Sequence, residues 1–249
     1  MMDLSTILPI PDLTQAKRLL AFSPHPDDNE VGAGATIARL ISQGCEVVYV
    51  VATVGQAGSE DMGITTQELG QVRKREQEEA LKTLGGGEVI FWSYPDTMLR
   101  AHESALQSDV LRVIRQYRPD FVMAPDPWLP YEAHPDHRTL GHAVATGVIM
   151  APFSLAFQQS GTPVPSPAIA FYGSAWPNAF IDVSGTFDRK LAALEAHKSQ
   201  FAPPLGPQLM MYLTLHAQEN GQKIGVERAE PFKVLTQHHL HFNAYAWQS

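Results

Sequence analysis

Two short apolar runs in this chain are each followed by a His-Pro-Asp sequence, and this pairing constrains the fold more than any other feature. The runs span residues 18–23 and 121–124, and the segments that follow are His25-Pro26-Asp27-Asp28 and His134-Pro135-Asp136-His137. Short apolar runs bounded by Pro and Asp are typical of buried strands that end in a turn. Two imidazoles and one carboxylate from these turns would make an open three-ligand site of the kind that binds catalytic zinc.

Strand-like and helix-like stretches alternate through the first 150 residues. The pattern predicts strands at about 18–23, 46–53, 89–92 and 121–124, and helices at about 31–43, 66–84, 104–117 and 137–150. Strands separated by helices favour a parallel sheet that is covered by helices on both faces. The expected fold class is therefore α/β, with a doubly wound, mostly parallel sheet in a three-layer αβα arrangement.

The topology of such a sheet brings the two His-Pro-Asp turns together. In the common strand order 3-2-1-4-5, strands 1 and 4 are neighbours, and the direction of winding reverses between them. Ligands of doubly wound sheets bind at this switch point, outside the carboxyl ends of the strands. We therefore expect His25 and His134 to meet there, although more than a hundred residues separate them.

The last third of the chain has a less regular pattern. It predicts strands near 168–172 and 180–183, helices near 186–198 and 209–218, and a proline-containing surface loop at 153–168. Loops 55–63, 127–131 and 153–168 are expected to rim the site, because loops carry much of the binding in such folds. No stretch has linker composition, so one domain over 1–249 is expected, with its core at about 15–235.

Composition indicates an ordinary globular protein. Of the 249 residues, 44% are hydrophobic and 18% are charged, and the formal net charge is −8. No block of Lys and Arg indicates a nucleic-acid partner, and no apolar run of about 18 residues predicts a membrane span. The first residues lack the charged and apolar regions of a signal peptide, so a cytoplasmic protein is expected. The single cysteine excludes an internal disulfide framework.

Several segments resemble, in order, the signatures of one family, the PIG-L (LmbE-like) zinc-dependent N-acetylglucosamine deacetylases. The first signature is matched by residues 25–37, HPDDNEVGAGATI, and the second by residues 134–138, HPDHR. Further matches lie at Arg73-x-x-Glu76-x-x-x-Ala80, at Tyr94-Pro95-Asp96, and at residues 190–194, 197–200 and 229–232. One four-residue motif alone would be weak, whereas a series of matches in family order is far more specific.

The resemblance implies a fold, an activity and a set of site residues. The fold is Rossmann-like, and the activity is removal of an acetyl group from N-acetylglucosamine-type sugars with the help of bound zinc. His25, Asp28 and His137 are implied as zinc ligands, Asp27 as the general base, and His134 as the acid or charge stabiliser. The implied partner is a small-molecule amino sugar, and the family also allows for a homo-oligomer.

The chemistry of these residue types agrees with the implied roles. Zinc binds neutral imidazoles and carboxylates, and three protein ligands leave a position for water, whose pKa the metal lowers toward about 7. His25 and Asp28 can converge on one ion, which leaves Asp27 free to accept a proton from that water. A protonated His134 would stabilise the oxyanion of the tetrahedral intermediate, and either Asp27 or His134 could protonate the leaving amine. Two His and one Asp also suit other divalent first-row metals.

Each of three further polar residues has two possible roles. Asp136 could orient an imidazole of the site, or it could cap the helix that starts near His137. Arg73 could bind substrate, or it could be a solvated charge that pairs with Glu76 on the same helix. Asp96 could bind sugar hydroxyl groups, or it could cap a turn.

Other polar residues are given a structural role. His197 and Gln200 lie at a helix end, where a structural hydrogen bond is at least as good an explanation as contact with substrate. His238, His239 and His241 are expected to be exposed or strand residues. Gly32 and Gly34 invite comparison with a nucleotide-binding glycine motif, but two carboxylates in the preceding turn would repel a nucleotide phosphate. These glycines are therefore expected to allow close helix–sheet packing.

Three functions follow for comparison. The first is a zinc-dependent hydrolase that removes an acetyl group from an N-acetylated amino sugar conjugate. The second is a related metal-dependent amidase that acts on a different acyl or thiol conjugate. The third is a non-catalytic sugar- or metal-binding protein, which the unused carboxylate of Asp27 disfavours because a binder needs no general base.

Overall fold

A mixed sheet forms the centre of the computed structural model, which describes residues 7–242 and 246–247. Within these residues seven strands follow the order β3-β2-β1-β4-β5-β7-β6. The first five are parallel, whereas β7 is antiparallel to both of its neighbours. The strands are β1 Arg18–Ser23, β2 Glu46–Val51, β3 Glu88–Phe91, β4 Phe121–Pro125, β5 Ala168–Tyr172, β6 Ala179–Asp182 and β7 Ala229–Leu235.

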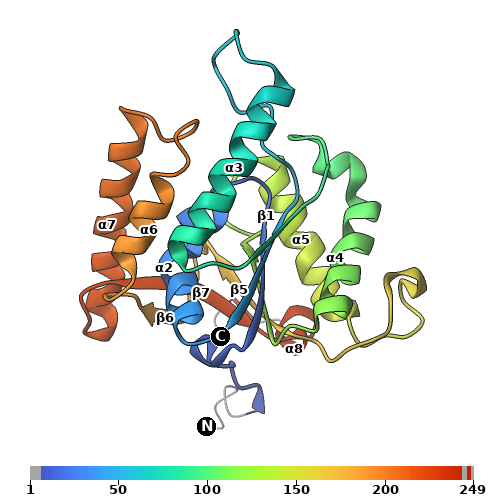
Figure 1. Ribbon diagram of the computed structural model, residues 1–249. Coiled ribbons are helices and arrows are strands. Elements are labelled where there is room, and N and C mark those ends of the chain that lie inside the picture. Colours follow the sequence, from blue (N-terminus) through green and yellow to red (C-terminus); the bar gives the residue numbers. More distant parts are fainter. Residues whose placement is uncertain (1–6, 243–245, 248–249) are drawn as a thin grey trace.

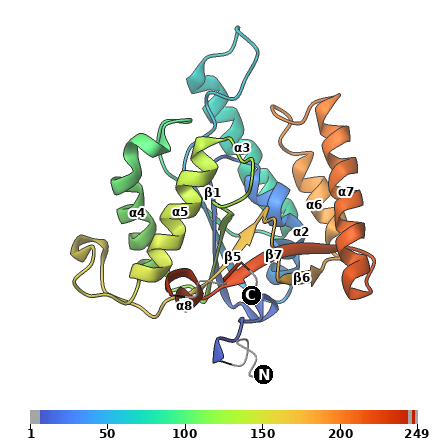
Figure 2. The same cartoon turned by 180° about the vertical axis from the view of Figure 1, so that it is seen from behind.

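Helices cover both faces of this sheet, which gives the expected three-layer Rossmann-like arrangement (Figures 1 and 2). On one face lie α2 Asp28–Ser42, α3 Thr66–Leu84, α6 Phe187–Leu194 and α7 Leu205–Ile224. On the other face lie α4 Glu103–Tyr117, α5 Pro135–Met150 and the short α8 Gln237–His241. Three 3-10 turns complete the elements: η1 Leu13–Gln15, η2 Leu99–His102 and η3 Gln158–Ser160.

The two hydrophobic cores of the molecule follow from the alternation of side chains along the strands. In β1, Leu19 and Ala21 belong to the core under α2, whereas Leu20 and Phe22 belong to the core under α5. A parallel strand that is buried on both faces therefore reads as one continuous apolar run. This is why the central strands could be recognised from the sequence.

The first four strands confirm the predicted order. Leu19 pairs with Phe121 in the register of β1 and β4, so the carboxyl ends of these two strands are adjacent. The long helix predicted at 66–84 is confirmed at both ends. Thr65 and Glu68 form a capping box at its start, and Gly85 follows its end with a φ of 128°.

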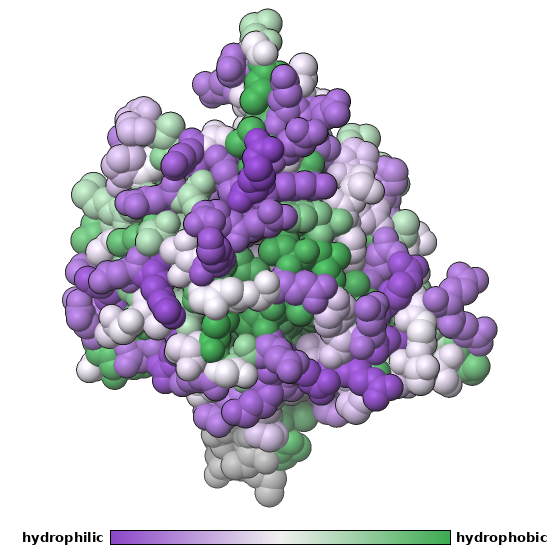
Figure 3. Space-filling model, in the orientation of Figure 1, coloured by the Kyte–Doolittle hydropathy of each residue, from purple (hydrophilic) through white to green (hydrophobic). Residues whose placement is uncertain are grey.

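The outer surface of α3 carries charges of both signs and appears hydrophilic in Figure 3. Its exposed side chains include Lys74, Arg75, Glu78, Glu79 and Lys82. Mixed signs at helical spacing produce a solvated face rather than a basic stripe. No helix among the described residues is long and apolar enough to cross a membrane.

The C-terminal region contains two elements that the sequence pattern did not predict. Strand β7 includes Glu230, Pro231 and Lys233, which break the apolar alternation expected of a strand. The histidines near the end lie in α8, where His238 and His241 are exposed as expected, whereas His239 is buried. In both cases tertiary contacts decide the structure of a segment whose local pattern is ambiguous.

The loop at 153–168 does not rim the site, contrary to the sequence expectation. It joins the end of α5 to the start of β5, so it reaches the amino edge of the sheet, opposite the His-Pro-Asp turns (Figure 1). The buried Arg115 of α4 holds this region by donating to the carbonyl oxygens of Met150, Ala151, Phe153, Ala156, Phe157 and Gly161. The loop is therefore part of the scaffold.

Candidate active site

The first His-Pro-Asp turn connects β1 directly to α2, which begins at Asp28 rather than near Val31. Asp27 precedes the helix with a φ of 101°, a conformation that residues with a side chain rarely adopt. The turn brings His25 Nδ1 to 3.3 Å from Asp28 Oδ2. The backbone N–H of His25 also donates to the same oxygen at 2.9 Å. Two of the expected metal ligands therefore converge as predicted.

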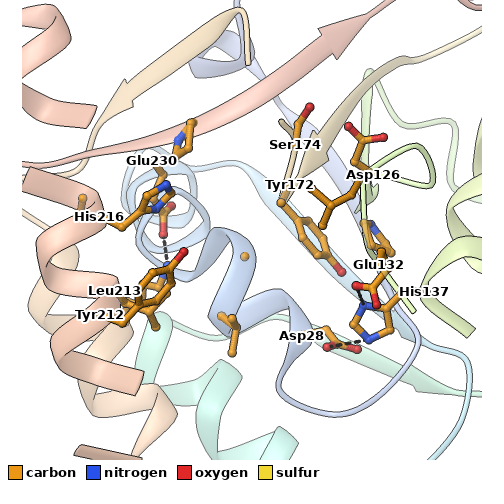
Figure 4. Close-up of a pocket in the computed structure, with 18 of the residues that line it drawn as sticks. Asp28, Asp126, Glu132, His137, Tyr172, Ser174, Tyr212, Leu213, His216 and Glu230 are labelled. Atoms are coloured by element: carbon orange, nitrogen blue, oxygen red, sulfur yellow. Dashed lines mark hydrogen bonds and ion pairs between the residues drawn. The ribbon is translucent and has the colours of Figure 1, made fainter. Parts of the chain in front are cut away.

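The second turn supplies the remaining imidazoles from the start of α5. His137 Nε2 lies 3.4 Å from Asp28 Oδ1 (Figure 4). Asp28 therefore contacts both expected histidine ligands through its two carboxylate oxygens. The ring centroids of His25 and His134 are 4.6 Å apart. One ligand atom from each of His25, His134 and His137 lies within 4.8 Å of the others, close enough for a single ion.

Two carboxylates lie on the far side of the His25 ring from Asp28. His25 Nε2 is 3.0 Å from Asp96 Oδ1 and 3.6 Å from Asp136 Oδ2. Burial opposes a charge on this imidazole, but Asp136, Asp28 and Asp96 together raise the pKa of His25 to about 11. The surroundings of His25 thus favour a positive charge at this point, which a metal ion would supply.

The donor set fits a divalent cation on these observations. Without an ion, the nearby carboxylates favour a proton on His25. An ion held by His25, Asp28 and His137 would supply the positive charge in place of that proton. Ligating histidines commonly donate their second N–H to a carboxylate, which fixes the tautomer and the ring orientation. Asp96 and Asp136 are placed to accept that bond from His25 Nε2.

Asp136 does not cap α5, which begins at Pro135. The N-cap is His134, whose Nδ1 accepts a hydrogen bond from the backbone N–H of Asp136 at 3.3 Å. The buried carboxylate of Asp136 instead accepts from the backbone N–H of Thr97 at 2.7 Å and of Leu99 at 3.1 Å. Asp136 therefore connects the start of α5 to the segment after Asp96.

His134 lies beside the ligands with a defined tautomer. Because Nδ1 accepts the capping hydrogen bond, the proton of a neutral ring is on Nε2. Burial and the rings of His25 and His137 hold the pKa of His134 below its ordinary value. These surroundings favour a neutral ring that donates through Nε2, rather than the protonated form expected from the sequence.

Asp27 is buried next to the expected ligands and lines the same cavity as His25 and His134. Burial and the charge of Asp28 raise its pKa to about 7, although Arg73 opposes the shift. Arg73 Nη2 donates to Asp27 Oδ2 at 3.0 Å and to the carbonyl oxygen of Pro26 at 2.7 Å. Asp28 shows the opposite shift: despite burial, His137 and His25 hold its pKa well below the ordinary range.

Arg73 is buried and is not the solvated partner of Glu76. Its Nη1 donates to the carbonyl oxygen of Gly55 at 2.9 Å, and a Cβ at Gly55 would lie 2.1 Å from that nitrogen. Glu76 accepts instead from the N–H and hydroxyl of Ser199. Arg73 thus joins the turn before α2 to the loop at 55–63.

A buried polar network beneath Asp27 was not recognised as part of the site. Gln77 Oε1 accepts from the backbone N–H of Asp27 at 3.1 Å, and its amide donates to Glu30 Oε1 at 2.9 Å. Glu30 Oε2 also lies 3.5 Å from His197 Nε2. Gln77 lies one helical turn after Arg73, and this i,i+4 spacing on one helix face was the available signal.

Two cavities adjoin the ligands from different sides. A polar cavity of about 320 Å³ is lined by His25, Asp27 and His134, with Arg73, Asp96 and Gln200. A more apolar cavity of about 250 Å³ is lined by Asp28 and His137, and extends to Tyr172 and α7 (Figure 4). As expected, loop 55–63 contributes Ala57 and Gly58 to the first cavity, and loop 127–131 contributes Leu129 to the second.

Fold and site together define an α/β protein with a His- and Asp-rich centre, suited to one metal ion, at the switch point of its sheet. The family model described as "PIG-L: GlcNAc-PI de-N-acetylase" matches residues 20–148. The chain therefore belongs to the PIG-L family.

Individual relatives agree over most of the chain. A diacetylchitobiose deacetylase of Thermococcus kodakarensis is 34% identical over 234 residues, covering 92% of this chain and 87% of the relative. A 1D-myo-inositol 2-acetamido-2-deoxy-alpha-D-glucopyranoside deacetylase of Rhodococcus erythropolis is 29% identical, covering 74% and 81%. The solved structure of N,N'-diacetylchitobiose deacetylase from Pyrococcus horikoshii has a TM-score of 0.86 and 35% identity, covering 92% and 87%. These relatives are deacetylases of N-acetylglucosamine-type compounds.

Proposed function

We propose that this protein is a zinc-dependent hydrolase that removes the acetyl group from an N-acetylated amino sugar conjugate. The observation that carries the proposal is Asp27, a buried carboxylate with a pKa of about 7 in the cavity that is also lined by His25 and His134, two of the side chains that could hold a metal ion. A base of this pKa can accept and return a proton near neutral pH. The activities of the relatives support the same reaction type.

His25, Asp28 and His137 would hold the metal ion. Zinc, or another divalent first-row ion, supplies polarisation of the amide carbonyl and activation of a water molecule when it is bound. Asp96 and Asp136 keep the ring of His25 oriented through its Nε2. In this proposal Asp136 is a positioning residue rather than a group that contacts the substrate.

The chain itself performs the proton transfers and stabilises charge. Asp27 accepts the proton of the attacking water, and Arg73 keeps its carboxylate in place. The Nε2–H of His134 is available to donate to the oxyanion that develops on the amide oxygen. Asp27, protonated in the first step, is then the proton donor for the leaving amine.

The polar cavity is the proposed position of the reacting sugar. Arg73 and Asp96 line it and are the proposed substrate-binding residues for ring hydroxyl groups, together with Gln200. Asp96 would also retain its contact with His25, since a carboxylate accepts several hydrogen bonds. Cytoplasmic location and assembly into a homo-oligomer stay predictions of the sequence.

Release of free amine from a panel of N-acetylglucosaminides tests this function. The zinc-loaded protein should release amine, and the same protein after chelation should not, with activity restored when zinc is returned. Metal content is measured in every sample. Absence of release from all members of the panel by protein with zinc bound would contradict the proposed function.

A further inference from the structure

A buried pair of titratable side chains lies behind the proposed base and takes no part in the proposed proton transfers. Glu30 is in the first turn of α2, His197 follows the end of α6, and neither side chain is exposed. His197 Nε2 lies 3.5 Å from Glu30 Oε2. Among the described residues, neither ring nitrogen of His197 makes a hydrogen bond. An apolar side chain would fill this space without burying unsatisfied polar groups, so the contact with Glu30 is what a histidine adds.

His197 supplies positive charge beside Glu30. Burial opposes a charge on the His197 ring, but Glu30, Asp27 and Glu76 together hold its pKa above the ordinary value. The charge of Glu30 also acts on the buried Tyr49, because burial and this charge raise the pKa of the Tyr49 hydroxyl well above the ordinary range. Tyr49 therefore stays neutral. The contact with His197 balances the buried carboxylate of Glu30, which would be costly without a partner.

Contacts with α3 fix the position of His197. Helices α3 and α6 lie side by side, and the turn after α6 carries Ser199 (Figures 1 and 2). The N–H and the hydroxyl of Ser199 donate to the carboxylate of Glu76 at 2.9 Å and 2.6 Å. The ring of His197 also packs edge-on against Phe201, with the ring centroids 6.2 Å apart. Because Glu76 precedes Gln77 on α3, this turn is anchored beside Gln77.

Gln77 joins the buried pair to the backbone of the proposed base. The N–H of Asp27 can only donate and the carboxylate of Glu30 accepts, so the amide oxygen of Gln77 faces Asp27 and its NH2 group faces Glu30. Glu30 thus fixes which way the amide points. With the amide reversed, its NH2 group would meet the N–H of Asp27, and both donors would lose their partners.

We propose that His197 is a positioning residue for Asp27 and acts through Glu30 and Gln77. His197 holds Glu30, Glu30 orients the amide of Gln77, and this amide holds the N–H of Asp27 in its left-handed conformation. The inference rests on the proposed function, because it concerns the base of that reaction. Displacement of a reacting group by about 1 Å can lower a rate by roughly 10²-fold, so this chain of contacts acts on kcat.

Three variants test the chain of contacts without changing a proposed metal ligand: His197→Leu, Gln77→Leu and the two combined. His239→Leu is the matched control, because His239 is also a buried histidine but lies in α8, on the other face of the sheet. An unfolding transition and the zinc content are measured for each variant. If His197→Leu does not fold, His197→Gln replaces it with the same expectation, since it keeps a polar group at the site without the charge.

The kinetics of amine release from the best N-acetylglucosaminide of the panel give the first measurement. His197→Leu should lower kcat by roughly tenfold and leave KM and zinc affinity within about twofold of the unaltered protein. The double variant should be no slower than Gln77→Leu alone, because both changes break the same chain of contacts. His239→Leu should have the kcat of the unaltered protein.

Hydrogen exchange of backbone amides, measured by NMR, gives a second measurement that needs no turnover. In the zinc-loaded protein, His197→Leu and Gln77→Leu should both accelerate exchange of the Asp27 amide. The amide of His25, which donates to Asp28, is the internal reference and should be unaffected. If this pattern is seen without amine release, the proposed function fails, whereas the positioning of Asp27 by His197 is supported.

Three results would overturn the inference. The first is unchanged exchange of the Asp27 amide in His197→Leu. The second is a double variant whose loss of kcat equals the product of the two single losses, because His197 would then act independently of Gln77. The third is a loss of zinc affinity or a rise in KM as large as the loss of kcat, which would indicate general damage to the site.

Discussion

At the scale of single residues, Asp27 combines a strained backbone with a buried carboxylate. Its positive φ costs free energy, and such a conformation persists only where the surroundings fix it. Here Gln77 accepts from its N–H and Arg73 donates to its side chain. The turn therefore places Asp28 against His25 and His137, while Arg73 holds the side chain of Asp27.

Asp27→Asn should remove activity while leaving metal binding intact. The amide has nearly the same shape and can still accept a hydrogen bond from Arg73, but it cannot take up a proton. Loss of a general base lowers kcat by roughly 10²- to 10⁴-fold. Amine release and zinc content are measured together, with the exposed Asp188→Asn as the control. Full activity of Asp27→Asn would exclude Asp27 as the base.

Asp96→Asn should weaken metal binding as well as catalysis. The carboxylate lies 3.0 Å from His25 Nε2, and its other oxygen accepts from the N–H of Ala57. Loss of such a partner of a ligating histidine typically lowers metal affinity by roughly 10- to 100-fold. Competition with a zinc chelator measures the affinity. An unchanged affinity combined with a raised KM would assign Asp96 to the sugar alone.

At the scale of elements, a buried ion pair holds α2 in place. Glu230 of β7 lies 2.6 Å from Lys190 of α6. The same carboxylate accepts from the backbone N–H groups of Ala35 and Thr36, within α2. Three elements are thus joined behind the helix whose first residue is Asp28, and this explains why 190–194 and 229–232 appeared as motifs.

Lys190→Met should destabilise the fold strongly because it leaves the charge of Glu230 buried without its partner. The expected loss of unfolding free energy is roughly 3–5 kcal/mol. Addition of Glu230→Gln should cost less than the sum of the two single changes, because the uncompensated charge is removed. Chemical denaturation measures all three variants.

The control for this prediction is Asp188→Asn, which breaks the exposed pair between Asp188 and Arg228. Exposed pairs of this kind contribute about 0–1 kcal/mol. A similar small change in Lys190→Met would show that the buried pair does not hold α2.

At the scale of the whole molecule, the site depends on the order of the strands. Its proposed metal ligands come from two segments more than a hundred residues apart, which meet because β1 and β4 are neighbours. A preformed ligand set therefore exists only in the folded chain. Metal binding must accordingly stabilise the folded state relative to the unfolded state.

Zinc should raise the melting temperature of the chelated protein. Free zinc at 100 times its dissociation constant adds about 2.7 kcal/mol, which corresponds to a shift of several degrees for a chain of this size. The Asp28→Ala variant should show a much smaller shift, because it lacks the carboxylate between the two histidines. Identical melting curves with and without zinc would contradict a metal site built from these residues.

The sequence was sufficient to predict an element wherever its local hydrophobic pattern and its residue chemistry agree. Buried apolar runs marked β1, β2 and β4, and the helix-like pattern at 66–84 marked α3. The alternation of strands and helices then predicted their order, and that order predicted that His25 and His134 would meet. Strand β7 could not be predicted, because its proline and charged residues interrupt the apolar pattern. Its burial depends on partners that are distant in the chain.

The sequence by itself determined the fold class and the two His-Pro-Asp segments that carry the proposed metal ligands, because both depend on local periodicity and residue chemistry. Only the tertiary structure decided which carboxylates face His25, that Glu230 pairs with Lys190, and that loop 153–168 lies at the amino edge. These features arise from contacts between residues far apart in the chain, and short-range sequence patterns do not predict such contacts.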